Sequence, residues 1–245
     1  MKTRNVLFTG AALALLLLPA CSGDEPEYRT ETTLLDSDTS LKEMAIGETR
    51  RFFAQEGETD GITWFSADTA VARVSADGTV TAVTAGETTI SAGIDRRTVA
   101  NYNLHVHPGY VKITETDGTS LVRYLAESQH DWNSTTDASG DSLTVHEFGF
   151  VAMDNRLYNY QFEIWLHVYL EGKDKLDPGA GDWKLFPATY KTCYYDDYRN
   201  KERIYLTLHE FACSKNDSGD YSISANATDE ENRSVEMRYT GTPND

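Results

Sequence analysis

The sequence predicts an all-β chain with two successive domains, and two patterns support this fold class. Between residues 34 and 107, short runs of alternating apolar residues are separated by turn residues at intervals typical of a β-sandwich. Between residues 157 and 172, apolar and polar residues alternate without interruption, which predicts one long strand with one buried face. No helical periodicity competes with either pattern in the sequence, so we expect strands joined by turns.

The first twenty residues have the composition of a secretory signal. Lys2 and Arg4 precede an apolar run from Val6 to Leu18, which is too short to cross a bilayer. Ala20 stands immediately before Cys21, and this ending resembles the lipobox of bacterial lipoprotein signals. The resemblance implies that the signal is removed and that Cys21, as the first mature residue, carries a lipid.

An acidic linker is expected between this anchor and the first domain. Residues 21–33 contain Asp24, Glu25, Glu27 and Glu31 with almost no apolar side chain, so they cannot bury enough surface to offset the entropy of ordering. Acidic residues after the lipidated cysteine resemble the surface-export signal of Bacteroidota-type lipoproteins. The resemblance implies an outer-membrane location with exposure at the cell surface; a generic solvated linker is the alternative interpretation.

The charge balance narrows the range of partners. The chain has 22 Lys and Arg against 39 Asp and Glu, which gives a formal net charge of -17 at pH 7. Nucleic acid and anionic lipid surfaces repel such a chain, because binding to them depends on cations that meet the phosphates. We therefore expect no nucleic-acid partner, and contact with the membrane through the N-terminal lipid.

Residues 34–107 carry a series of short motifs. In order, these are Gly47-Glu48-Thr49, Trp64-Phe65-Ser66-Ala67-Asp68, Val71-Ala72-Arg73-Val74, Asp77-Gly78-Thr79-Val80-Thr81 and Ala85-Gly86-Glu87-Thr88-Thr89-Ile90. The series resembles the group 2 bacterial immunoglobulin-like domain of intimin- and invasin-type adhesins. The resemblance implies an immunoglobulin-like β-sandwich with Trp64 in its core and a tight hairpin turn at Asp77-Gly78. It also implies a spacer or adhesive module without a catalytic site.

Residues 108–245, which we call the head, follow a Pro-Gly junction and are expected to form a second all-β domain, a sandwich or a barrel. Besides the long strand, predicted strands cover residues 110–115, 120–125, 142–153, 183–195, 203–212, 220–227 and 234–239. Polar loops are predicted at residues 137–141, 174–182 and 216–220. The motifs of the head indicate no particular family.

The polar face of the long strand holds a candidate glycan-binding site. Trp165 and Tyr169 lie two steps apart on this face, roughly 13 Å along the strand. Sugars stack their apolar C–H faces on such rings, while their hydroxyl groups pair with acidic and amide side chains. Tyr194, Tyr195 and Tyr198 flank two aspartates at a predicted hairpin tip with the same mixture. Alternatively, Trp165 and Tyr169 pack beneath a second sheet or a loop.

The sequence offers few further candidates for a disulfide, a metal site or a catalytic site. Cys193 and Cys213 form an even pair in an exported chain, so a disulfide between them is allowed, although spacing alone does not show that the sulfurs meet. The acidic loop near Asp217 does not have the residue spacing of a calcium-binding loop. In each of the two adjacent His-Glu pairs, the two side chains would point to opposite faces of a strand, so they cannot bind one metal ion together. The sequence has no nucleophile elbow and no phosphate loop. We expect no metal, cofactor or catalytic residue.

These features predict a lipid-anchored cell-surface protein that is not an enzyme. Its immunoglobulin-like spacer presents a β head for adhesion to, or interaction with, a host or envelope macromolecule. The alternative is a glycan-binding lipoprotein that assists polysaccharide capture. Exposure of Trp165 and Tyr169 in one concave patch would favour this alternative.

Overall fold

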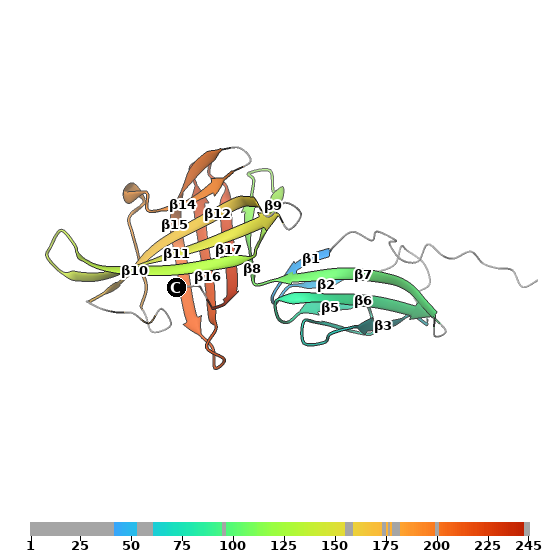
Figure 1. Cartoon of the computed structure of the whole chain (residues 1–245). Coiled ribbons are helices and arrows are strands. Elements are labelled where there is room, and N and C mark those ends of the chain that lie inside the picture. The colour runs from blue at the N-terminus through green and yellow to red at the C-terminus, as the bar shows by residue number, and fades with distance from the viewer. Residues whose placement is uncertain are drawn as a thin grey trace, which may run out of the picture. The chain divides into compact units, whose positions relative to one another are not determined.

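The computed structural model describes residues 42–52, 61–94, 97–154, 159–172, 175, 177, 182–198 and 201–242. Strands dominate this part of the chain, and the predicted all-β fold class is confirmed (Figure 1). The signal segment, Cys21 and the acidic linker lie outside the described residues. No helix in the described ranges has the length and apolar character needed to cross a membrane.

The first part of the fold is a sandwich of two sheets. One sheet has the order β1 (Lys42–Ala45), β7 (Arg97–His107), β6 (Gly86–Ile94) and β3 (Thr63–Ser66). The other has the order β2 (Thr49–Arg51), β5 (Thr79–Ala82) and β4 (Ala72–Val74). Alternate residues of these strands point between the sheets, as the period-two pattern predicts.

The sandwich core differs from the expectation in one respect. Val80, Ile90 and Tyr102 are almost fully buried, whereas Trp64 is half-buried at the edge of the core. The predicted turn at Asp77-Gly78 is confirmed, because the Gly78 amide donates to the Ser75 carbonyl at 3.0 Å. Gly78 has a φ of +81°, a left-handed conformation that residues with a Cβ rarely adopt.

The head is one curled antiparallel sheet. Its strands are β8 (Gly109–Thr114), β9 (Ser120–Leu125), β10 (Glu127–Thr136), β11 (Ser142–Asp154), β12 (Asn159–Glu171), β14 (Cys193–Asp197), β15 (Glu202–Lys215), β16 (Tyr221–Asp229) and β17 (Ser234–Gly241). Neighbouring strands are hydrogen-bonded in the order β10, β11, β12, β14, β15, β16, β17, β8 and β9. Because β9 continues through Ala126 into β10, the ladder closes on itself as a barrel, one of the two predicted forms.

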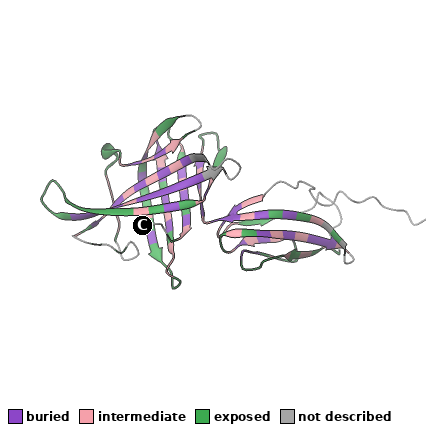
Figure 2. Ribbon diagram, viewed as in Figure 1, coloured by how far each residue is buried: buried purple, intermediate pink, exposed green. Residues whose placement is uncertain are grey.

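The predicted long strand is confirmed as β12. Phe162, Ile164, Leu166, Val168 and Leu170 are buried inside the barrel, and the odd-numbered residues from 163 to 169 are half-buried on its outer face (Figure 2). The barrel interior is therefore a packed hydrophobic core. Its rigidity fixes the positions of the side chains on the outer face.

Two elements of the head differ from the prediction. The sequence did not predict β10, because its polar residues show no apolar alternation. Most residues of β10 are exposed in the structure (Figure 2). The single strand predicted at 183–195 is instead β13 (Lys184–Leu185), the 3₁₀ turn η1 (Ala188–Tyr190) and β14. Residues of this interrupted segment and of the long β10–β11 hairpin together line one cavity.

Candidate functional site: a cavity beneath the projecting hairpin

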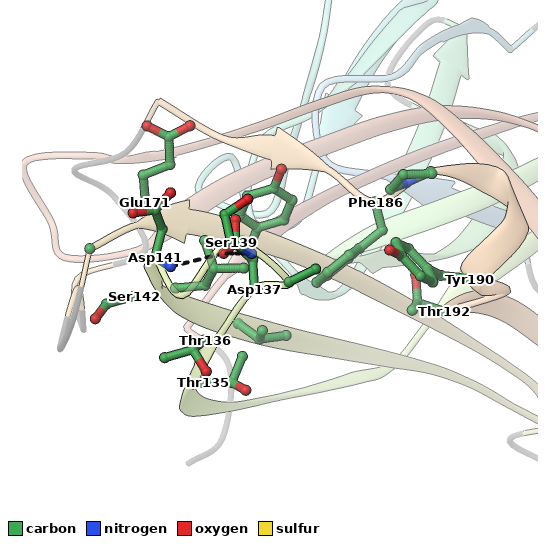
Figure 3. A pocket seen from close by; sticks show the side chains of 16 residues that line it. Thr135, Thr136, Asp137, Ser139, Asp141, Ser142, Glu171, Phe186, Tyr190 and Thr192 are labelled. Atoms are coloured by element: carbon green, nitrogen blue, oxygen red, sulfur yellow. Dashed lines mark hydrogen bonds between the residues drawn. The ribbon is translucent and has the colours of Figure 1, made fainter.

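The β10–β11 hairpin extends beyond the neighbouring strands of the barrel (Figure 1). A cavity of about 1030 Å³ lies against its tip (Figure 3). The described residues that line it are Thr135, Thr136, Asp137, Ala138, Ser139, Asp141, Ser142, Leu143, Val145, Tyr169, Glu171, Gly172, Phe186, Pro187, Tyr190 and Thr192. A pocket of this size accommodates a ligand of several rings.

Asp137 shapes the tip of the hairpin. Its Oδ1 accepts hydrogen bonds from the backbone amides of Ser139, at 2.8 Å, and of Asp141, at 2.9 Å. The amide of Asp137 in turn donates to the carbonyl of Asp141 at 2.9 Å. This turn keeps the polar rim of the cavity in one conformation.

Aromatic rings form one end of the cavity. The Tyr169 and Phe186 rings lie 4.8 Å apart between centroids, and Tyr190 meets Phe186 edge to face at 6.2 Å. Tyr190 is 64% exposed, so its ring is available to a ligand. Leu143 and Val145 add buried apolar surface to the lining. An apolar ligand face can therefore pack against rings that the protein itself holds in place.

Carboxylates and hydroxyl groups form the polar part of the lining. Figure 3 shows Glu171 and Asp141 at the end of the cavity away from Phe186 and Tyr190. Among the described lining residues none is lysine or arginine, whereas the hairpin adds several threonine and serine hydroxyl groups. The cavity thus offers many hydrogen-bond acceptors, with hydroxyl groups that both donate and accept.

The structure separates the two residues predicted on the long strand. Tyr169 lines the cavity, whereas Trp165 stands outside it, half-buried on the same outer face. Trp165 pairs with Gly149 on one side and with Tyr194 on the other, and its ring lies over the position where Gly149 lacks a Cβ. The two residues therefore share a face but do not share one concave patch.

The three tyrosines predicted at one hairpin tip also lie on different faces of the sheet. Tyr195 faces the barrel interior, is 2% exposed and receives a 2.6 Å hydrogen bond from Arg233, so its inclusion in an exposed glycan platform was wrong. Adjacent residues of a strand point to opposite faces, which separates Tyr195 from Tyr194. Tyr194 and Tyr198 lie on the outer side, where the Tyr198 hydroxyl donates to Glu163 at 2.8 Å, but neither lines the cavity.

Cys193 and Cys213 are both free and buried, so the disulfide that the sequence allowed is not formed. Cys193 lies opposite Leu206 in the β14–β15 ladder, and Cys213 is further along β15. Seven residues of extended strand span about 23 Å, far beyond the reach of two thiols.

Phe186 and Tyr190 were missed as site residues. Both were assigned to the interior of a continuous strand, where their side chains would have belonged to the sheet faces. Pro187 could have indicated the interruption, because proline lacks the amide that a ladder needs. The chain turns through η1 at this point, and Lys191 follows with a φ of 49°.

A second polar cluster lies inside the barrel. His146 is completely buried, and its Nε2 lies 2.7 Å from the carbonyl oxygen of Lys175. A carbonyl can only accept, so Nε2 carries the proton and Nδ1 accepts from His130 Nε2 at 2.9 Å. Burial lowers the pKa of His146 from 6.5 to about 4. This pair holds the chain at Lys175 against β11.

The fold defines this protein as an all-β chain that combines a two-sheet sandwich with a closed head. Residues 39–99 match the family model of the bacterial Ig-like domain (group 2), which confirms the resemblance seen in the sequence. A domain of this family indicates a surface or adhesion-type module. No curated protein matches the chain in sequence.

Proposed function

We propose that this chain is a lipid-anchored cell-surface binding protein without enzymatic activity, in which the Ig-like domain presents the head to a ligand. Cys21 would carry the lipid, and the acidic linker would direct the protein to the outer face of the outer membrane. The cavity beneath the β10–β11 hairpin carries the proposal, because it combines aromatic rings with a rigid polar rim. Binding proteins use such a combination of apolar surface and a few oriented polar groups.

The arrangement suits adhesion because exposed segments are held on a packed scaffold. The hairpin tip and η1 are exposed, whereas the β11 and β12 positions that support them belong to the buried core. A rigid support lowers the entropy that a binding loop loses when it meets its ligand. The partner would be a macromolecule of the host or of a neighbouring envelope.

Beads coated with the mature chain would test this proposal. We expect them to adhere to host-cell or envelope surfaces, and the Tyr190→Ala variant to lose most of this adhesion. Phe65→Ala is a matched control, because Phe65 is 54% exposed but belongs to the Ig-like domain. Equal adhesion of coated and uncoated beads would contradict the proposal.

A second candidate function is glycan binding in support of polysaccharide capture. It is favoured by the contact of Tyr169 with Phe186 at one end of a cavity whose other end is formed by carboxylates. Affinity electrophoresis in polysaccharide gels, with reducing sugar measured alongside, tests this candidate. Retardation without sugar release supports binding, whereas release of sugar would contradict the non-enzymatic proposal.

A further inference from the structure

We infer that the cavity beneath the β10–β11 hairpin takes an uncharged oligosaccharide segment and rejects acidic polysaccharides. The inference rests on the glycan-binding candidate above and names its ligand class. It also assigns the rings of Phe186 and Tyr190, beside Tyr169, as the stacking surface.

The described lining of the cavity carries negative charge. Asp137, Asp141 and Glu171 bring three carboxylates to the cavity, and the described lining residues include no lysine or arginine. A uronate or sulfate group would enter a field of its own sign without a cation to meet it. The net charge of -17 for the whole chain adds repulsion at longer range.

Two described lysines near the lining, Lys184 and Lys191, are already paired with carboxylates, and the side chain of a third, Lys175, packs against Gly172 of the lining. Lys184 lies opposite Tyr169 in the β12–β13 pair, and its Nζ is 3.1 Å from Asp182. Lys191 lies between Tyr190 and Thr192 in the chain, and its Nζ is 2.8 Å from Glu230. An acidic ligand would have to displace these partners, which would leave the carboxylates without their counter-ions.

The polar lining distinguishes a sugar from a positively charged ligand. A cation needs acceptors only, whereas each sugar hydroxyl group both donates and accepts. The threonine and serine hydroxyl groups of the hairpin meet this requirement, and the carboxylates accept from sugar hydroxyl groups. The rings supply the apolar surface on which the C–H face of a sugar stacks.

Affinity electrophoresis of the mature chain tests the ligand class. The probes are neutral β-glucan, mannan and galactan, with polygalacturonate, alginate and chondroitin sulfate as acidic counterparts. We expect retardation by at least one neutral polysaccharide and none by the acidic ones. Tyr190→Ala should weaken the retardation at least tenfold, whereas Tyr198→Ala, which removes an exposed ring outside the cavity, should leave it unchanged.

A charge reversal tests the cause of the selectivity. We expect Glu171→Lys to bind acidic polysaccharides that the unaltered chain rejects. Glu202→Lys is the matched control, because Glu202 is exposed at the start of β15 and does not line the cavity. An equal gain in both variants would overturn a local role for the cavity carboxylates.

The remaining outcomes separate this inference from the candidate function on which it rests. If no polysaccharide retards the chain, glycan binding and the inference both fail. If acidic polysaccharides alone retard the chain and Tyr190→Ala abolishes the effect, glycan binding stands and the uncharged class is overturned. If octalysine binds more tightly than every neutral polysaccharide and depends on Tyr190, the ligand is a basic peptide and the inference is overturned.

Discussion

Gly78 shows how a single residue connects the sequence motif to the sandwich core. Its positive φ closes the β4–β5 hairpin, and its carbonyl accepts a hydrogen bond from the Phe52 amide at 2.9 Å. A Cβ at this position would collide with the Phe52 carbonyl oxygen and with the Trp64 ring. The turn glycine therefore serves both the backbone conformation and the close packing of the two sheets.

Gly78→Ala should lower the free energy of unfolding of the Ig-like domain by about 2 kcal/mol or more, because steric overlap adds to the strain of a positive φ. Gly47→Ala is the matched control. Gly47 has a φ of +85°, and the Cβ that alanine would add meets open space, so its replacement should cost only about 1 kcal/mol. Urea unfolding of each variant measures the difference, and equal losses would refute the proposed overlap.

His146 makes the stability of the head depend on pH. Its pKa is lowered from 6.5 to about 4 by burial, so between these values the unfolded chain binds a proton that the folded chain does not. Stability should therefore fall by up to about 3 kcal/mol as pH decreases from 6.5 to 4.

Urea midpoints measured between pH 7 and pH 4 check this dependence. His146→Gln should flatten the pH dependence even if it lowers stability at pH 7. His209→Gln is the control, because His209 is exposed and its Nε2 contacts the Thr228 hydroxyl at 2.7 Å. An unchanged slope in His146→Gln would show that another group titrates.

Among the structural elements, β14 and β15 decide the state of the cysteines. Their register places Cys193 and Cys213 at separate points of the barrel, each buried. Burial raises the pKa of both thiols, to about 12 for Cys213, which keeps them protonated and unreactive in the folded chain.

Thiol labelling tests this separation. The folded chain should label slowly, whereas the denatured, non-reduced chain should label at both positions to full stoichiometry. A reduced sample provides the control and should give the same final value. Failure of both residues to label after denaturation would mean that they are bonded, contrary to the strand register.

At the scale of the whole molecule, the anchor at Cys21 stays a prediction. Cys21→Ala should move the protein from the membrane fraction to the soluble fraction, because one lipid-modified residue provides the only attachment that we propose. Cys193→Ala should remain with the membrane, since its thiol is inside the barrel. Detergent phase partitioning measures both, and unchanged partitioning of Cys21→Ala would contradict the lipobox interpretation.

Local patterns in the sequence were sufficient for the all-β class, the Ig-like motifs and the long strand β12. Their signals are short in range: alternation of apolar residues, turn residues and a glycine with positive φ each act within a few positions. The same reasoning placed Tyr169 correctly on the outer face of β12, half-buried rather than in the core. The domain boundary near Pro108 also came from local composition and stays a prediction.

Only the tertiary structure decided which side chains meet. It closed the head into a barrel, added the polar strand β10, separated the two cysteines and turned Tyr195 inward. It also brought Phe186 and Tyr190 to Tyr169, because η1 interrupts what the sequence indicated as one strand. These contacts depend on strand register and chain reversal between distant segments, and alternation along a single segment contains no information about either.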